Sequence, residues 1–471
     1  MWLTFRKMTK DNKKVVALGA GISGLAAAFK LDRQGYDVTV LEAAAAPGGS
    51  AQSAVKDGFL IDYGPNTGLD TSPAIRELVE AAGLEEEMIY ANESSNNRYI
   101  LKKGRLVALP MRPADFVRSR LFSPAAKMRV LLEPFMPGSS DGYHQSLAQF
   151  VKRRLGREFL EYVVDPFVSG VSAGDPYQLS VKSAFPKLYA LEEKYGSLVK
   201  GFIRGAKERK ARGEASKQSA RMFSFKNGMQ ALPAALAGKL GSKVRYNCTV
   251  TRVERDQDGY TIRYHEGGKE NVMKADAVVS TIPAYRAAGV FSGIDPVLSR
   301  RLSEIYYPPV MILYLGYKKE DAPDARGFGF LIPSVEDKKF LGAIWNSSIF
   351  PGRAPDDSVC FTLFIGGARD STVFMMDREA LEEQAIVEFQ QIMNIEGLPV
   401  IRERRFWEKA IPQYNVGYIE HENYFEEFER KQPGLFLAGN YRGGISFGDC
   451  IKNAGEVASK VEKFLNKELR A

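Results

Sequence analysis

Cysteine and histidine are scarce in this chain of 471 residues, which has three of each. The few that occur are scattered along the sequence: Cys248, Cys360, Cys450, His144, His265 and His421. Cysteines this far apart do not form a disulfide framework, and none of the six has the spacing of a metal-binding motif. We therefore expect a protein of a reducing compartment that has no metal site.

Long apolar runs are also missing. No stretch reaches the roughly 18 apolar residues that cross a bilayer, and the first twelve residues lack the apolar core of a secretory signal. The net charge, 65 − 57 = +8, is moderately basic. This charge is compatible with acidic substrates or with an anionic membrane surface. We expect a cytoplasmic location with peripheral membrane contact, and no nucleic-acid partner.

The strongest local pattern lies between Lys14 and Glu42. An apolar run over 15–18 predicts a buried strand, 22–34 a helix, and 37–41 a second strand. Between the first strand and the helix lies a G-x-G-x-x-G motif, formed by Gly19, Gly21 and Gly24. Such glycines permit a tight turn, a close approach to a pyrophosphate and close helix packing, while the helix N-terminus attracts the phosphates. The segment therefore predicts dinucleotide binding.

Glu42 ends the second strand, where a carboxylate can accept hydrogen bonds from both ribose hydroxyls. An acid at this position disfavours the 2′-phosphate of NADP. Gly49 and Ser50 then suit a loop beside the cofactor, 59–62 is a predicted strand, and 64–67 (GPNT) is a tight turn. With the first motif, these stretches resemble the FAD-binding part of the amine oxidase and protoporphyrinogen oxidase superfamily.

Further along, 73–82 has the pattern of an amphipathic helix, and 98–109 that of a hairpin turning at Lys103–Gly104. Arg98 opens this hairpin. Its guanidinium is either a solvated charge at a strand end or a ligand for a substrate carboxylate, since a bidentate pair of this kind is strong and directional.

From 112 to 221 the pattern is helical and basic, with two helices expected to break at Gly156 and to stop at Pro166. A charge run such as 194–226 is usually a solvated face. Because Leu121, Phe122 and Phe202 lie near these basic residues, attraction to a membrane surface is the alternative.

The remaining segments predict strands and one further helix. We expect paired strands over 243–254 and 260–265, one strand over 274–283, and a mixed sheet from 308–317, 328–332, 340–346 and 359–365. A helix over 378–393 and a buried strand over 435–438 follow. The last glycines, Gly439, Gly443 and Gly444, precede a helix near Gly448, whose positive end would face a flavin.

Four stretches make the resemblance more specific: SNNRYI, EYVVDPFVSGVSAGDP, GFGFLIPS, and AIPQYNVGY with LAGNYRGGIS. From Lys14 almost to its end, the chain resembles the oxygen-dependent, FAD-containing protoporphyrinogen oxidases. This resemblance implies an α/β fold with a discontinuous Rossmann-like FAD-binding domain, a mixed-sheet substrate domain and an α-helical membrane-associated subdomain. The expected bounds are 1–95, 216–290 and 416–471 for FAD binding, 96–215 for substrate and helical membrane binding, and 291–415 for the substrate sheet.

The resemblance also assigns site residues, position by position. The FAD contacts it implies, together with Gly49 and Ser50, are Gly19, Ala20, Gly21, Ile22, Ser23, Gly24, Glu42, Ala43, Gly64, Pro65, Asn66, Thr67, Val250, Trp407, Ile445, Ser446 and Phe447. On the substrate side, Arg98 matches the arginine that pairs with a propionate. Leu331, Ile344 and Phe364 match apolar residues that sandwich the tetrapyrrole rings, although ordinary sheet packing explains them as well. No catalytic side chain is assigned.

The implied activity is the six-electron oxidation of protoporphyrinogen IX to protoporphyrin IX in heme biosynthesis, with FAD as cofactor, oxygen as acceptor and a homodimer as a further expectation. Coproporphyrinogen III oxidation is the alternative within the family. An amine oxidase or carotenoid desaturase is a second alternative, and a flavin-binding porphyrin carrier without turnover is a third.

Overall fold

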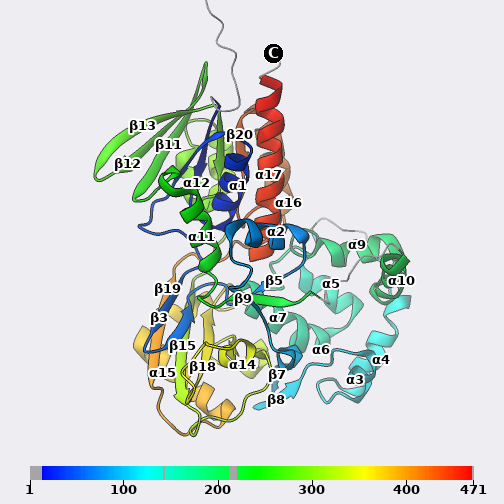
Figure 1. The fold of residues 1–471 in the computed structure, drawn as a ribbon. Helices are drawn as coiled ribbons and strands as arrows, with labels where there is room; N and C mark the ends of the chain where they lie inside the picture. The colour runs from blue at the N-terminus through cyan, green and yellow to red at the C-terminus, as the bar shows by residue number, and fades with distance from the viewer. Residues whose placement is uncertain (1–12, 140, 142–143, 212–219, 469–471) are drawn as a thin grey trace, which may run out of the picture.

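A computed structural model of the protein describes residues 13–139, 141, 144–211 and 220–468. A parallel sheet, a mixed sheet and a group of helices form its three parts (Figure 1). The basic segment expected at 194–226 is described only in part, because 212–219 lie outside these residues. The predicted α/β class is confirmed, including a nucleotide-binding sheet assembled from separate stretches of the chain.

The parallel sheet has five strands, and its members come from three distant stretches of sequence. Its order is β10 (Val244–Arg245), β2 (Asp37–Leu41), β1 (Lys14–Leu18), β14 (Ala277–Ser280) and β20 (Leu435–Leu437). The predicted strand–helix–strand unit is confirmed, since α1 (Ile22–Arg33) connects β1 to β2. The central position of β1 places its carboxyl end, and the glycine turn that follows, in the middle of the sheet.

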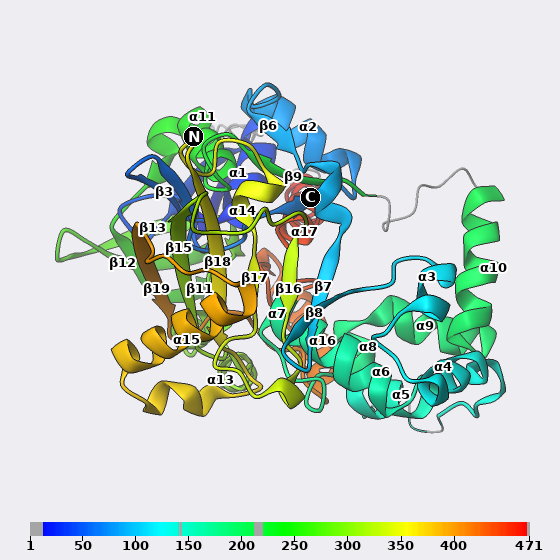
Figure 2. The same cartoon turned by 90° about the horizontal axis from the view of Figure 1, so that it is seen from below.

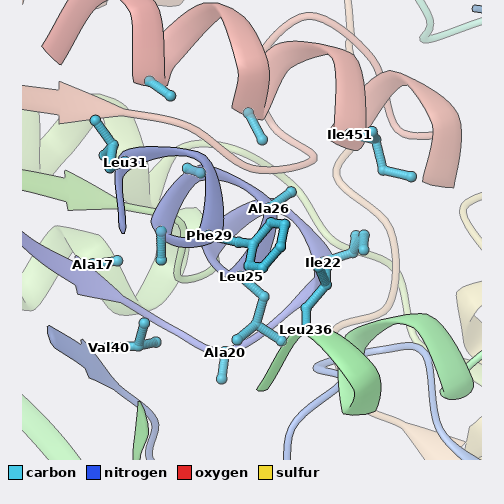
Figure 3. Close-up of a cluster of buried hydrophobic side chains, with 14 of the residues drawn as sticks. Ala17, Ala20, Ile22, Leu25, Ala26, Phe29, Leu31, Val40, Leu236 and Ile451 are labelled. Carbon is cyan, nitrogen blue, oxygen red and sulfur yellow. The ribbon is translucent and has the colours of Figure 1, made fainter. Parts of the chain in front are cut away.

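Alternate side chains of this sheet enter two separate cores. On one face, Ala17 and Val40 pack against α1, α2 (Pro73–Ala82), α11 (Ala231–Leu240) and α17 (Phe447–Glu468). Figure 3 shows this core, with Leu236 of α11 and Ile451 of α17 on opposite sides of α1. On the other face, Val16 and Leu18 pack against the remaining layer. That layer consists of β11 (Cys248–Asp256), β12 (Gly259–Glu266), β13 (Lys269–Ala275), α12 (Ala284–Val290), α13 (Pro296–Ser303) and α16 (Tyr418–Lys431).

Two predicted strands are wrong in extent because the chain changes sheets within them. The stretch 243–254 divides into β10, in the parallel sheet, and β11, in the antiparallel β11–β12–β13 sheet. The break falls at Asn247, whose φ is +54°. The stretch 274–283 divides at Asp276 between β13 and β14. There the Asp276 carboxylate accepts hydrogen bonds from the Lys13 side chain and the Lys14 N–H, at 2.9 and 2.7 Å.

The second sheet is mixed, as predicted, and has seven strands, three more than the four predicted stretches. Its order is β19 (Ile401–Trp407), β15 (Val310–Lys318), β18 (Ser358–Gly366), β17 (Gly342–Ile344), β16 (Gly329–Leu331), β7 (Arg98–Lys102) and β8 (Arg105–Ala108). The hairpin expected at Lys103–Gly104 is therefore an edge of this sheet. One face packs on α15 (Arg378–Met393) through residues such as Phe330, Leu363 and Phe389.

Short strands and turns connect the two sheets. The strand expected at 59–62 is β4 (Phe59–Asp62), paired with β3 (Ser53–Lys56). A further three-stranded sheet has the order β5 (Gly68–Leu69), β9 (Met222–Phe225) and β6 (Met88–Tyr90). A short helix, α14 (Asn346–Ile349), follows β17.

The helices between 113 and 211 form a group away from the parallel sheet, with α7 nearest the centre of the molecule and the others at one side (Figure 2). They are α3 (Pro113–Arg118), α4 (Pro124–Leu131), α5 (Leu147–Arg154), α6 (Arg157–Phe159), α7 (Asp165–Ser172), α8 (Val181–Ala184), α9 (Pro186–Tyr195) and α10 (Leu198–Ala211). The expected stop at Pro166 is wrong. Pro166 lies in the first turn of α7, after a π-helical segment (Leu160–Val164), and a missing N–H is tolerated in a first turn.

The prediction that Leu121, Phe122 and Phe202 form an apolar surface near the basic residues is partly wrong. Leu121 and Phe122 are buried, because they pack with Ile100 of the seven-stranded sheet. Phe202, in contrast, is 48% exposed. Among the described residues, no helix is both long and apolar enough to cross a membrane.

Candidate functional site

The glycine turn after β1 is as tight as its sequence predicts. Gly19 has a φ of +97°, a value that glycine tolerates best. A Cβ added to Gly24 would lie 2.0 Å from the carbonyl oxygen of Gly19, so only glycine lets α1 approach the turn this closely. A Cβ on Gly21 would meet only the Cα of Gly49, at 3.9 Å. Gly21 therefore leaves the surface beside Gly49 open to a ligand.

The N-terminus of α1 has no side-chain cap among the described residues. Its N-cap is Gly21, which has no side chain, and its first turn carries no acidic residue. Ser72, Ser123 and Ser146 cap α2, α4 and α5 with their side chains. The free N–H groups of the first turn, which includes Ile22 and Ser23, can therefore bind a pyrophosphate.

Glu42 is held in place at the end of β2. Its Oε2 accepts a hydrogen bond of 2.6 Å from the N–H of Ala20, and its Oε1 one of 2.8 Å from the N–H of Ala44. A carboxylate has about four acceptor positions. Two of them remain for ribose hydroxyls. The neighbouring Ala43 is exposed beside this carboxylate.

Two loops complete this side of the site. Gly48 forms a parallel bridge with Gly21, and the following residues, Gly49 and Ser50, are exposed. A Cβ on Gly64 would lie 1.8 Å from the carbonyl oxygen of Ser50, so the 64–67 turn packs directly on the 48–50 loop. Together, the open glycine surface, the uncapped helix and the oriented Glu42 fit an adenine dinucleotide.

The other expected cofactor contacts lie in the cores next to these loops. Val250 and Ile445 pack against the core that contains Leu18, whereas Phe447 belongs to the core on the α1 side. Trp407, at the end of β19, donates a hydrogen bond of 2.8 Å from its indole N–H to the carbonyl oxygen of Tyr63. That bond ties the edge of the seven-stranded sheet to the turn that contains Gly64.

The start of α17 differs from that of α1. Ser446 accepts a hydrogen bond of 3.1 Å from the N–H of Asp449 and donates one of 2.6 Å to its Oδ2. The first turn of α17 is therefore capped and carries an acid, and Asp449 offsets part of the positive potential expected there.

The 64–67 turn is joined to the seven-stranded sheet by a buried polar network. The amide of Asn346 donates a 2.7 Å hydrogen bond to Oδ1 of Asn66, and the Thr362 hydroxyl donates one of 2.9 Å to Oδ1 of Asn346. All three side chains are less than 9% exposed. Such a network fixes the position of the sheet relative to the turn.

The four expected substrate residues share one face of the seven-stranded sheet. One row of paired residues crosses four strands in the order Arg98, Gly329, Ile344 and Thr362. The row two residues further along contains Ile100, Leu331, Gly342 and Phe364. Since residues opposite each other and residues two apart point to the same side of a sheet, Arg98, Leu331, Ile344 and Phe364 point together, away from α15.

This face is partly open. Leu331, Ile344 and Phe364 are half-buried, whereas the residues that alternate with them are fully packed on α15. Gly329 and Gly342 lie between these side chains and contribute no side chain of their own. The result is a half-buried apolar floor, of which Leu331 also packs against Ile100, Leu121 and Phe122.

Arg98 is half-buried at the edge of this floor. Its guanidinium lies 5.6 Å from the ring centre of Phe328, and Nη2 lies 3.9 Å from the sulfur of Met222. Burial lowers the pKa of Arg98 below its ordinary value, and no carboxylate of the described side chains opposes that effect. A guanidinium that is partly removed from water and has no anion favours binding one.

Several residues of this site were not predicted from the sequence. Asn346 and Thr362 belong to the polar network, and Asp165 and Arg369 form an ion pair of 3.4 Å next to the floor. Polar residues beside predicted strands only weakly indicate a functional site. A polar residue inside an apolar strand, such as Thr362 in SVCFTLFIG, is the one usable indication.

Comparisons with known proteins agree with this geometry. The family model for flavin containing amine oxidoreductases matches residues 22–461. The Arabidopsis thaliana protein named protoporphyrinogen oxidase 2, chloroplastic/mitochondrial, is 35% identical, over 97% of this chain and 95% of that protein. The Bacillus subtilis (strain 168) protein named coproporphyrinogen III oxidase is 28% identical, over 97% of this chain and all of that protein. A crystal structure of a protein from Exiguobacterium sp. 255-15 has the same fold, with a TM-score of 0.78, 23% identity, and coverage of 96% of this chain and 99% of that one.

Proposed function

The chain belongs to the family of flavin containing amine oxidoreductases, and from this premise we propose that it oxidises protoporphyrinogen IX to protoporphyrin IX. The reaction removes six electrons, with FAD as cofactor and oxygen as acceptor. One structural observation carries the assignment to a carboxylated tetrapyrrole: a half-buried arginine, with no carboxylate partner among the described side chains, borders a half-buried apolar sheet face.

FAD is the cofactor, as the sequence predicts. In this proposal the first turn of α1 would hold its pyrophosphate, Glu42 its ribose, and the 64–67 turn with Ile445 its ring system. When bound there, FAD would supply the acceptor for the substrate's electrons and a route for them to oxygen. The buried contact between Asn66 and Asn346 then sets how the substrate floor lies relative to the cofactor.

The floor residues bind and orient the substrate. Leu331, Ile344 and Phe364 present an apolar surface to the pyrrole rings, and burying it favours binding by about 25 cal/mol per Å². Arg98 pairs with a propionate at the edge of the floor. Positioning of this kind lowers the barrier without a catalytic side chain, because the reacting carbon is held in one place.

The alternative substrate is coproporphyrinogen III. The similarity to the Bacillus subtilis coproporphyrinogen III oxidase, which extends over 97% of this chain, favours keeping this alternative. Both reactions need the same cofactor and a tetrapyrrole floor, so they differ only in the carboxylates that the pocket must accept.

A direct assay tests the proposal. The purified protein, whose absorption spectrum shows whether flavin is bound, is mixed with each porphyrinogen in air, and porphyrin fluorescence and peroxide are recorded. We expect flavin bands and faster formation of protoporphyrin. Faster coproporphyrin formation would select the alternative. Reduction of the flavin by neither substrate without air would reject both, and it would leave the amine oxidase or carotenoid desaturase and the carrier as the remaining interpretations.

Peripheral membrane contact is part of the proposal. We define the helical patch as the exposed apolar residues of α3, α4, α10 and the short 3₁₀ turn between α4 and α5: Val117, Met128, Leu131, Phe135, Phe202 and Ile203. Phe135 is 78% exposed and Leu131 64%. Glu133, beside Phe135, accepts hydrogen bonds from the N–H groups of Leu198 and Val199, which ties α10 to this turn.

Basic residues such as Lys127, Lys200 and Arg204 lie on the same helices. Exposed apolar groups beside cations are the combination that binds an anionic bilayer surface. A cytoplasmic location, the homodimer and the domain bounds given above stay predictions.

A further inference from the structure

The two ends of the substrate floor differ in charge. Arg98 pairs with Gly329 at the start of β16, and the chain leaves β16 at Ile332, three residues further along. At roughly 3.3 Å per residue these ends lie about 10 Å apart. A tetrapyrrole on this floor therefore has one edge near Arg98 and another near the residues that surround Ile332.

The second end is built around Arg369. Its Nη1 donates hydrogen bonds to the carbonyl oxygen of Ile332 at 2.9 Å, to the Ser169 hydroxyl at 3.2 Å and to Oδ2 of Asp165 at 3.4 Å. The same carboxylate oxygen accepts a 2.7 Å hydrogen bond from the N–H of Ser334. Asp165 therefore holds this guanidinium, whereas Arg98 has no carboxylate partner among the described side chains.

Two more carboxylates act on Arg369. Burial lowers the pKa of Arg369, and the charges of Asp165, Asp370 and Asp175 work against that shift. Three carboxylates around one guanidinium leave this end with a net charge of 1 − 3 = −2 when all are ionised. Asp175 and Asp370 are less buried than Asp165, so their charge reaches the neighbouring surface.

Helix α7 brings this end over the floor. It begins at Asp165, and a Cβ added to its Gly170 would lie 2.2 Å from Cδ2 of Leu331. Ala368, next to Arg369, donates a 2.7 Å hydrogen bond to the carbonyl oxygen of Ala173, just after the helix. The acidic end and the apolar floor are therefore parts of one wall.

We propose that Asp165 and Asp175 determine specificity: they make the α7 end of the floor repel carboxylates, so that propionates lie toward Arg98 and uncharged substituents toward α7. The inference rests on the proposed function and narrows its substrate. A porphyrinogen with two propionates at one edge can place both near Arg98 and keep its uncharged edge near the acidic end. One with four propionates must place a carboxylate at the acidic end.

The test compares the two substrates in the full-length holoenzyme. The kcat/KM of protoporphyrinogen IX and of coproporphyrinogen III is measured at low ionic strength for the wild type, Asp175→Asn, Asp165→Asn and the double variant. Asparagine keeps an acceptor for the N–H groups of Tyr177 and Ser334 that these carboxylates bind. Asp258→Asn, in the exposed turn between β11 and β12, removes the same charge far from the floor and is the control.

We expect the ratio of the coproporphyrinogen value to the protoporphyrinogen value to rise about tenfold for each removed charge, because two unit charges roughly 10 Å apart at an effective dielectric constant near 20 change an equilibrium by about that factor. Asp258→Asn should leave the ratio unchanged. The affinity for the product coproporphyrin III, measured by fluorescence quenching, should rise in parallel. A purely structural role of Asp165 would lower both kcat/KM values equally.

Turnover with an unchanged ratio in Asp175→Asn would overturn the inference and leave the proposed function standing. This variant keeps the test decisive even if Asp165→Asn does not fold. Absence of turnover with both substrates in the wild type would reject the proposed function, and the inference with it.

Discussion

Asn346 donates a 2.7 Å hydrogen bond to Asn66 across 280 residues of sequence. Asn66 belongs to the turn that follows β4, and Asn346 begins α14, directly after the substrate strand β17. Thr362, on the neighbouring strand, completes the contact by donating to Asn346. One buried polar network thus sets the distance between the cofactor side and the substrate floor.

Removal of this contact should lower both stability and activity. In Asn346→Ala, the Asn66 oxygen and the Thr362 hydroxyl lose their short hydrogen bonds to Asn346 and keep only a 3.5 Å hydrogen bond to each other. A poorly satisfied buried polar group costs about 1–3 kcal/mol. We expect a lower melting temperature and a lower kcat with FAD still bound. Thermal unfolding and steady-state kinetics measure both. The control is Asn271→Ala on β13, whose exposed side-chain amide donates a 3.1 Å hydrogen bond to the carbonyl oxygen of nearby Lys269. Equal effects of the two variants would contradict the positioning role.

Arg98→Ala should impair substrate binding and leave the cofactor in place. Loss of a hydrogen-bonded charge contact costs about 1.5–3 kcal/mol, which corresponds to a rise in KM of roughly 10- to 100-fold. The flavin absorbance per protein should not change, and Arg98→Lys should restore part of the affinity. Arg105→Ala, an exposed arginine on the adjacent strand β8, is the matched control. An unchanged KM in Arg98→Ala would remove Arg98 from the site.

The parts that local patterns specify could be predicted from the sequence. The β1–α1–β2 unit, α2 and the hairpin of β7 and β8 depend on neighbouring residues, and each lies where it was expected. In the folded sheet, the strand register places Arg98 and Ile344 on either side of Gly329. The sheet changes at Asn247 and Asp276 could not be predicted, because the apolar pattern continues through both.

The polar contacts of the site were beyond sequence reasoning for a different reason. Asn66, Asn346 and Thr362 meet only because two sheets built from distant segments pack together. The pair of Asp165 and Arg369 likewise joins a helix to the end of a strand 204 residues away. A polar residue gives no sign of its partner until the fold brings the two together.

Gly24→Ala should disrupt the nucleotide turn. The added Cβ would meet the Gly19 carbonyl oxygen at 2.0 Å, and a backbone atom cannot move aside as a side chain can. We expect loss of bound FAD and a lower melting temperature, measured by flavin absorbance and thermal unfolding. The control is Gly289→Ala on α12, where nothing lies within 4 Å of the new Cβ; alanine is favoured by up to about 1 kcal/mol in a helix interior. Full flavin content in Gly24→Ala would show that the turn is not where FAD binds.

The three thiols should be unreactive in the folded protein. Cys248, Cys360 and Cys450 are all buried, and burial raises the pKa of each to about 11. Only the thiolate reacts, so at pH 8 about one thiol in a thousand is reactive even when a reagent reaches it. Titration with a thiol reagent should give three fast equivalents in denaturant and almost none in the native state, with native reactivity rising only above about pH 10. A fast native equivalent at pH 8 would contradict this prediction.

The helical patch should bind anionic vesicles. A bilayer of phosphatidylcholine with phosphatidylserine offers an apolar interior to Phe135 and Phe202 and a negative surface to the adjacent lysines and arginines. In the double variant Phe135→Ser with Phe202→Ser, we expect sedimentation with these vesicles to weaken at least about tenfold, since each buried aromatic side chain contributes roughly 1.5–3 kcal/mol. Binding of the wild type should also weaken with added salt, because exposed charges are screened. The control is Leu398→Ser, an 83% exposed leucine in the loop between α15 and β19. If the wild type fails to sediment, or if Leu398→Ser weakens binding as much as the double variant, the patch is not a membrane surface.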